Sequence, residues 1–296
     1  MRYKPTAVFI LLLFSCTGVF AQKDQGYQLL RMTSAFTSFP DPARANGFLD
    51  GDSVFRPVAG HYDDSSVLLV VPPHLKRSRK TTLIFWFHGW HNSIDTALVF
   101  YGLARQLAAA DANAILVLPE AAKNSADSYG GKLRREGDFR GLVEDVMTEL
   151  RAYGIVQADA EAAHIVLGCH SGGYSAVADI LKYGAEEVDA VWMFDALYGH
   201  LPVFMDWIRA GRRHQFVHWF TNHGGGTDAM SDSLMQRLKE GHVGYLLTEE
   251  AQLTPAMVRE NRILFIHSPR QHNVIINDPD DFRLLLENSS VTLGKR

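Results

Sequence analysis

Apolar residues along this chain gather in short unbroken runs, separated by polar stretches and by stretches with helical spacing. An unbroken apolar run of about 4–8 residues is typical of a strand that is buried on both faces of a sheet. Residues 22–60 carry no comparable pattern. We predict strands at residues 65–73, 82–90, 113–119, 188–197, 215–222 and 262–267, and in the segment that begins at His164.

Apolar positions three and four residues apart follow many of these runs, which predicts amphipathic helices between the strands. We expect helices over residues 98–110, 139–153, 174–181 and 280–287, and one that begins near Asp228. Strands that alternate with helices predict the α/β class, with a doubly wound, mostly parallel sheet and helices on both faces. No repeat or low-complexity linker divides residues 22–296, so we expect a single domain there.

Residues 1–21 have the composition of a signal peptide. Arg2 and Lys4 supply the positive start, residues 7–14 the apolar run, and Val19-Phe20-Ala21 the cleavage signature. The apolar run is too short for a stable membrane span. We therefore expect an exported protein, periplasmic or extracellular.

The chain has two cysteines, Cys16 and Cys169. Residues 13–16 (LFSC) resemble a lipobox, so lipoprotein anchoring through Cys16 is an alternative to simple secretion. Cleavage after Ala21 leaves Cys169 as the single thiol, and the mature chain then forms no internal disulfide. A large domain stabilised by its core does not need one. Cys169 ends a buried strand, where we expect an inert, packed thiol.

Composition excludes several function classes. Hydrophobic residues make up 47% of the chain, enough for a substantial core, and charged residues make up 21% with mixed sign. Removing Arg2 and Lys4 with the signal takes the formal net charge from −4 to −6. A mildly acidic protein has no electrostatic reason to bind nucleic acid or an anionic membrane.

The clearest chemical motif surrounds Ser171, in the sequence Cys169-His170-Ser171-Gly172-Gly173. A buried strand, a tight glycine-flanked turn that holds a serine, and a following helix make a nucleophile elbow. Neighbouring backbone passes so close to such a turn that a bulky side chain would clash, and Gly173 has no side chain. Cys169 stands where the G-x-S-x-G pattern has its first glycine. The alternative is an ordinary strand-to-helix turn with a helix-capping serine.

The early apolar run at residues 82–90 ends in His88-Gly89-Trp90-His91. Hydrolysis of an acyl group needs backbone N–H groups aimed at the developing negative charge. The N–H groups of Trp90 and Gly172 are the candidates for this oxyanion hole. The alternative is a metal site at His88 and His91, but that spacing needs a helix and lacks the glutamate of a zincin. We expect no metal.

The chain resembles the α/β-hydrolase family over most of residues 65–288. The resemblance rests on the Ser171 elbow, on the His88-Gly89-Trp90 step, and on the order serine, acid, histidine along the chain. It implies Asp195 as the acid at a strand end and His272 as the base in the loop after the last strand. Asp228 and His267 are the respective rivals.

The resemblance implies a serine hydrolase that cleaves a carboxylic ester through an acyl-enzyme, without a cofactor. His88, Tyr174 and Tyr198 are expected to contact the substrate, a small-molecule or glycan-linked ester. Residues 120–135 either shape the substrate pocket or form a solvated loop. Amide or peptide hydrolysis at the same site is an alternative, as is a binding protein that keeps the fold without turnover.

Overall fold

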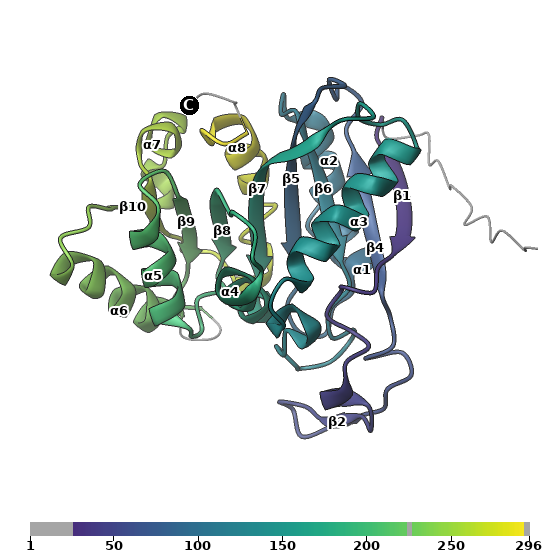
Figure 1. Cartoon of the computed structure of the whole chain (residues 1–296). Helices are drawn as coiled ribbons and strands as arrows, with labels where there is room; N and C mark the ends of the chain where they lie inside the picture. Colours follow the sequence, from purple (N-terminus) through teal and green to yellow (C-terminus); the bar gives the residue numbers. More distant parts are fainter. Residues whose placement is uncertain (1–25, 224–226, 293–296) are drawn as a thin grey trace, which may run out of the picture.

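The computed structural model describes residues 26–223 and 227–292 (Figure 1). The predicted signal segment and Gly224–Gly226 lie outside these residues. A nine-stranded sheet runs through the molecule in the order β1-β4-β6-β5-β7-β8-β9-β11-β10. Its strands are β1 (Gln28–Thr33), β4 (Ser66–Val71), β5 (Lys80–Phe87), β6 (Ala114–Pro119), β7 (Glu161–His170), β8 (Ala190–Phe194), β9 (Gln215–Phe220), β10 (Leu246–Glu249) and β11 (Ile263–His267).

Every neighbouring pair from β6 to β10 is parallel, whereas β4 runs antiparallel to both β6 and β1. This arrangement confirms the predicted doubly wound, mostly parallel sheet. The helices are α1 (Ile94–Phe100), α2 (Leu103–Ala109), α3 (Asp138–Ala152), α4 (Tyr174–Tyr183), α5 (Leu201–Ala210), α6 (Thr227–Glu240), α7 (Pro255–Glu260) and α8 (Asp281–Asn288).

Helices cover both faces of the sheet (Figure 1). Helices α3 to α6 pack on one face, and α1, α2, α7 and α8 pack on the other. Successive side chains of β5 alternate between the two cores: Phe85 belongs to the first, whereas Ile84 and Trp86 belong to the second. Burial on both faces explains why the strands read as unbroken apolar runs.

One sequence prediction needs correction. The single helix expected over residues 98–110 is two helices, because Gly102 has a positive φ of 59° that ends one and begins the next. Of the two alternatives for residues 120–135, the solvated loop is excluded, since Ser125 and Leu133 are fully buried and Lys132 donates to the carbonyl of Ala35.

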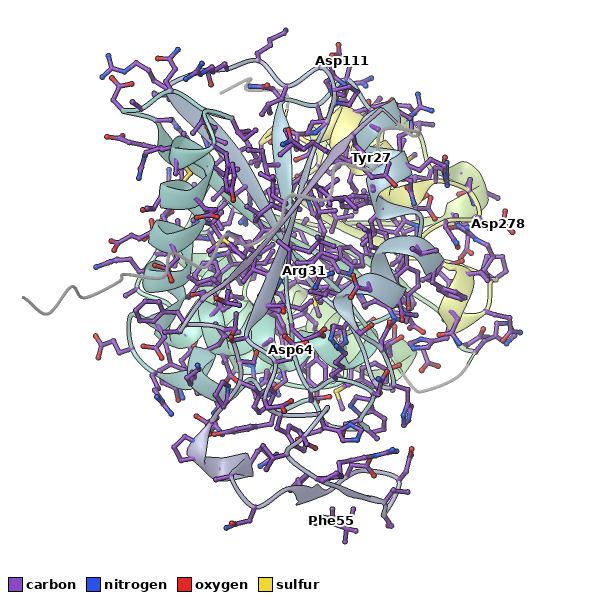
Figure 2. The ribbon with its side chains drawn as sticks, turned by 90° about the vertical axis from the view of Figure 1, so that its right-hand side faces the viewer. Tyr27, Arg31, Phe55, Asp64, Asp111 and Asp278 are labelled. Carbon is purple, nitrogen blue, oxygen red and sulfur yellow. The ribbon has the colours of Figure 1, made fainter. Side chains whose placement is uncertain are left out.

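The sequence pattern missed the edge strand β1 and a separate two-stranded hairpin. Strand β1 buries only alternate residues, and Figure 2 shows it at the near edge with Tyr27 and Arg31. A short hairpin of β2 (Phe48–Leu49) and β3 (Phe55–Arg56) projects from the body of the molecule, with Phe55 at its outer end. Among the described residues, no helix is long and apolar enough to cross a membrane.

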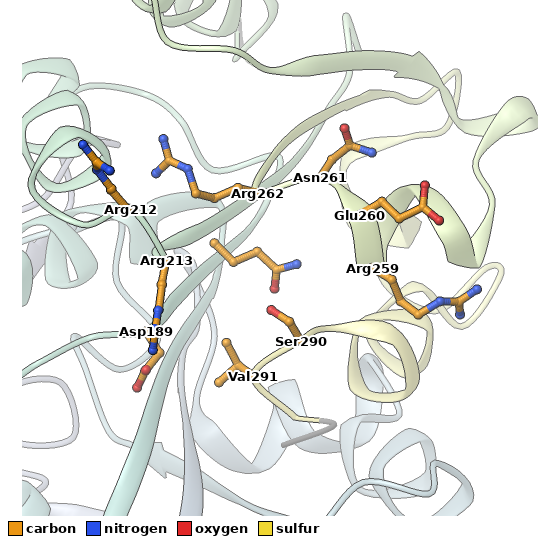
Figure 3. Close-up of a pocket in the computed structure, with 10 residues that line it drawn as sticks. Asp189, Arg212, Arg213, Arg259, Glu260, Asn261, Arg262, Ser290 and Val291 are labelled. Atoms are coloured by element: carbon orange, nitrogen blue, oxygen red, sulfur yellow. The ribbon is translucent and has the colours of Figure 1, made fainter. Parts of the chain in front are cut away.

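A hollow of about 310 Å³ lies where β8, β9 and β11 begin (Figure 3). Arginines gather around it, and Arg262 donates to the carbonyls of Ile208, Gly211 and His214. These bonds close the turns that lead into the strands. The chemistry predicted from the sequence lies at the opposite edge, where the parallel strands end.

Candidate active site

Ser171 stands in a strained turn between β7 and α4. Residues Ser171–Gly173 form one 3-10 turn, and Ser171 has a φ of 52°, which a non-glycine residue rarely adopts. A Cβ at Gly173 would collide with the carbonyl oxygen of Phe87. Gly173, two residues after the serine, is therefore required by close packing against β5, as the elbow motif predicts.

Cys169 occupies the position where the elbow pattern usually has its first glycine. The side chain is fully buried, and burial raises the pKa of its thiol, so it is an unreactive core residue. The close approach to the serine is made instead by Gly89, where an added Cβ would lie 2.6 Å from the Cβ of Ser171. The Cys169 side chain is accommodated in the core, and Gly89 leaves the space that Ser171 needs.

His272 and Asp195 are in direct contact. His272 begins a 3-10 turn after β11, and its Nδ1 lies 2.5 Å from Oδ2 of Asp195. The other carboxylate oxygen of Asp195 accepts from the backbone N–H of Thr221 and from the hydroxyl of Thr227. A carboxylate held in this way keeps the proton of His272 on Nδ1 and leaves Nε2 unprotonated, which is the tautomer a general base needs.

The rival residues lie away from the contact between His272 and Asp195. His267 is the last residue of β11, and its Nδ1 lies 2.9 Å from a carboxylate oxygen of Glu249 on the neighbouring strand. Asp228 lies in the first turn of α6. Its neighbour Thr227 is the residue that reaches Asp195. The structure therefore favours His272 and Asp195 over both rivals.

The candidate oxyanion hole lies between Trp90 and the elbow. A Cβ added to Gly89 would lie 3.1 Å from the backbone oxygen of His170, so the two main-chain segments are close, and the Trp90 side chain packs against Gly172. Within the described residues, the backbone N–H of Trp90 donates to no protein acceptor. The indole Nε1 of Trp90 donates to the hydroxyl of Ser128, which fixes the side chain at the rim.

His88 lies beneath this loop and not in the pocket lining, which corrects its predicted contact with substrate. The ring is almost fully buried: Nε2 lies 2.7 Å from Oε1 of Glu120, and Nδ1 lies 2.7 Å from the carbonyl oxygen of Gly89. That carbonyl belongs to the same planar peptide as the N–H of Trp90. By holding the carbonyl, His88 sets the direction in which the Trp90 N–H points.

Glu120 is a residue whose role sequence reasoning missed. It is fully buried where β6 ends, and its carboxylate also accepts from the N–H of Ile94 at the start of α1. An acid directly after an apolar strand was the available signal, because a buried carboxylate needs partners. His91, the other half of the alternative metal site, pairs with Asp52 instead. No group of three or more potential metal ligands is found among the described residues.

A pocket of about 790 Å³ opens over Ser171 and His272. Aromatic rings and uncharged polar groups dominate its wall. The lining residues are Trp90, His91, Asn92, Thr96, Phe100, Tyr101, Ser128, His170, Ser171, Gly172, Tyr174, Tyr198, His272 and Asn273. The set contains no lysine, arginine or carboxylate, so among these described residues a charged ligand meets no side chain with a permanent charge.

Tyr174 and Tyr198 both line the pocket, and their rings lie 5.8 Å apart. The Tyr198 hydroxyl lies near the side chain of Ser171. Burial raises the pKa of Tyr198, and the nearby Asp195 raises it further, so the hydroxyl stays protonated at neutral pH. Tyr198 therefore presents a neutral hydroxyl beside the candidate nucleophile.

Comparison with known proteins rests on structure, because no family model and no curated protein sequence matches this chain. A ferulic acid esterase superposes with a TM-score of 0.53 at 10% identity, covering 89% of this chain and 99% of that one. The chain has the α/β-hydrolase fold. A feruloyl esterase module from Clostridium thermocellum, complexed with sinapinate, has this fold as well, with a TM-score of 0.51 at 13% identity over 92% of this chain and 90% of the module.

The α/β-hydrolase fold confirms the family resemblance at the level of architecture. In this fold the nucleophile follows a central strand, and the acid and base follow strands further along the sheet. Ser171 after β7, Asp195 after β8 and His272 after β11 occupy places of this kind. The residue assignments themselves rest on the geometry described above.

Proposed function

We propose that this protein is a serine hydrolase that cleaves carboxylic esters through an acyl-enzyme intermediate. The observation that carries the proposal is the contact between His272 Nδ1 and Asp195 in a pocket that also contains Ser171, a serine with the strained backbone of an elbow. A serine hydroxyl is a weak nucleophile at neutral pH and needs such a base.

The proposed mechanism follows from the roles of these groups. The Oγ of Ser171 attacks the ester carbonyl carbon while Nε2 of His272 takes the hydroxyl proton, and Asp195 stabilises the resulting imidazolium. The N–H groups of Trp90 and Gly172 hold the oxyanion. When the C–O bond to the alcohol breaks, His272 gives its proton to that oxygen. A water molecule then attacks the acyl carbon while His272 takes its proton. When the bond to Ser171 breaks, His272 returns the proton to Oγ and the acid is released.

The lining of the pocket favours an uncharged ester substrate that carries a planar aromatic or apolar group. Its described wall has aromatic rings and lacks charged side chains. Burying a charged substrate there, without a partner, would cost several kcal/mol. The two structural neighbours named as feruloyl or ferulic acid esterases support the same substrate class. A glycan-linked aromatic ester is within this class, and the composition of residues 1–21 supports action outside the cytoplasm.

An active-site phosphonate probe and a panel of methyl, p-nitrophenyl and hydroxycinnamoyl esters, with matched anilides, test the proposal. We expect the wild type to hydrolyse at least one ester and to be labelled at Ser171. Ser171→Ala should lose both properties while keeping its melting temperature, with turnover reduced by about a thousandfold or more. A folded wild type that is neither labelled nor active would support a binding protein, and turnover of anilides alone would support an amidase.

The matched pair His272→Ala and His267→Ala tests the base. We expect His272→Ala to lose activity as fully as Ser171→Ala, and the double variant to be no worse, because the two residues act as a unit. His267→Ala removes a contact with Glu249 and ring packing against Phe220, and it should change the melting temperature more than the rate. Retained activity in His272→Ala, with loss in folded His267→Ala, would assign the base to His267.

A further inference from the structure

We propose that His170, which precedes the nucleophile, is a positioning residue that holds the loop of the catalytic base by its backbone, with Tyr101 fixing the tautomer of the His170 ring. The inference rests on the proposed function, because it concerns the orientation of His272. It adds two residues to the machinery that neither the elbow motif nor the serine, acid, histidine order identifies.

Both ring nitrogens of His170 have specific partners. Nε2 lies 3.0 Å from the backbone carbonyl oxygen of His272, and Nδ1 lies 2.8 Å from the hydroxyl of Tyr101. The ring is almost fully buried, and it packs against the His272 ring with centroids 4.4 Å apart and planes 38° apart. His170 therefore touches both the backbone and the side chain of the base.

The donors and acceptors define one tautomer. A carbonyl oxygen only accepts, so Nε2 of His170 must carry the proton. In a neutral ring Nδ1 is then the acceptor, and the Tyr101 hydroxyl donates to it. Tyr101 is buried, and burial raises the pKa of its hydroxyl, which keeps that donor protonated.

The charges around His170 agree with a neutral ring. Burial lowers the pKa of His170 to about 3, and repulsion from His272 contributes to the shift. Asp195 and the His272 carbonyl oppose that shift without cancelling it. The neutral ring matters for the reaction, because His272 becomes cationic during each transfer and a second cation in contact with it would oppose the step.

His272 is thereby held at two points. Asp195 holds Nδ1 of the side chain, and His170 holds the carbonyl oxygen of the same residue. Two fixed points on one residue leave little freedom for its Nε2, which must meet the hydroxyl of Ser171. Because His170 and Ser171 are adjacent in the chain, any movement of the elbow carries the base loop with it. The contact keeps the relative position of Ser171 and His272 constant.

The test compares His170→Phe, which keeps a flat ring but cannot donate, with His170→Gln, whose amide nitrogen has similar reach and can donate to the His272 carbonyl. We expect His170→Phe to lower kcat by about tenfold to a hundredfold with KM little changed, because misplacing the base by a fraction of an ångström affects the transition state. His170→Gln should restore part of the loss. Equal kcat in wild type and folded His170→Phe would refute the positioning role.

Tyr101→Phe and Tyr62→Phe form a second matched pair. Each removes one buried hydroxyl with a hydrogen-bond partner, His170 for Tyr101 and Ser125 for Tyr62. We expect similar losses in melting temperature, but a fall in kcat only for Tyr101→Phe. Equal effects on kcat would mean that Tyr101 acts through stability alone, which overturns its part in the proposal.

An NMR experiment on the imidazole rings gives a readout that does not depend on turnover. We expect His170 to stay neutral with its proton on Nε2 from about pH 5 to pH 8, as a pKa far below that range requires. A charged ring, or a proton on Nδ1, would overturn the hydrogen-bond pattern. A wild type without any turnover would instead refute the proposed function, whichever tautomer His170 shows.

Discussion

Single residues in this protein carry backbone strain where the chemistry is expected. Ser171 and Asp195 have positive φ values of 52° and 44°, although neither is glycine. Such conformations cost of order 1–3 kcal/mol each and persist when surrounding contacts enforce them. Asp195 is fixed by its own N–H, which donates to Trp219, and by the partners of its carboxylate. The strain places a buried acid under His272.

The pair Asp195→Asn and Asp228→Asn tests the identity of the acid. Asn at position 195 can present an amide to Nδ1 of His272 and so favour the wrong tautomer, and it cannot stabilise the imidazolium. We expect kcat to fall by roughly 10³–10⁴-fold for Asp195→Asn. Asp228→Asn should stay close to wild type, since Asp228 is a first-turn residue of α6. The reverse ranking in two folded variants would move the role to Asp228.

At the scale of elements, the ends of β5 and β6 together shape the candidate oxyanion loop. His88 directly follows β5 and forms a hydrogen bond with the Gly89 carbonyl. Glu120 follows β6 and forms hydrogen bonds with both His88 and the backbone at the start of α1. The loop that carries Trp90 is thus fixed from below by a buried pair. A donor with a fixed direction needs no reorganisation when negative charge develops.

His88→Phe tests this support. The variant keeps an aromatic ring but releases the Gly89 carbonyl, and with it the direction of the Trp90 N–H. We expect kcat to fall by about tenfold to a hundredfold with a smaller change in KM, because the donor acts on the transition state. His74→Phe is the control, since His74 also holds one backbone carbonyl, that of Ala112. Equal kinetics for the two variants would contradict the role of His88.

At the scale of the molecule, the loop of His272 is attached to distant parts of the fold by Arg270. Its guanidinium pairs with Glu250, after β10, and with Asp281, the first residue of α8. Its carbonyl accepts from the hydroxyl of Thr221, after β9. Burial raises the pKa of Asp281 from 3.8 to about 7, and Arg270 opposes this shift only in part. The anchor therefore has a pH-dependent stability.

An acid whose pKa is higher in the folded chain binds more protons when folded, so its contribution to the free energy of unfolding falls as pH rises from about 4 to about 7. We expect Asp281→Asn to flatten the dependence of melting temperature on pH between pH 5 and pH 8. Asp280→Asn is the control, because Arg105 lowers the pKa of Asp280 and its titration lies below pH 4. Parallel melting curves for wild type and Asp281→Asn across this range would refute the assignment.

Features that arise from residues adjacent in the chain could be predicted from the sequence. The apolar runs located the central strands closely, as in β11, predicted at 262–267 and observed at Ile263–His267. Burial on both faces leaves such strands few polar positions, so the apolar runs stand out. The elbow at Ser171 was equally readable, because a strand, a glycine turn and a helix are consecutive in the chain. Edge strand β1 was missed because it buries only alternate residues.

Which side chains contact one another could not be predicted from the sequence, because those contacts join distant parts of the chain. His170 lies 69 positions from Tyr101 and 102 from His272, and no local pattern records such contacts. The same reason explains the error at His88, which follows an apolar strand as a substrate-facing residue would, yet bonds to Glu120 below the pocket. Residue type and spacing predict the chemistry that a side chain can perform. Its partners, tautomer and direction depend on the elements that folding places beside it.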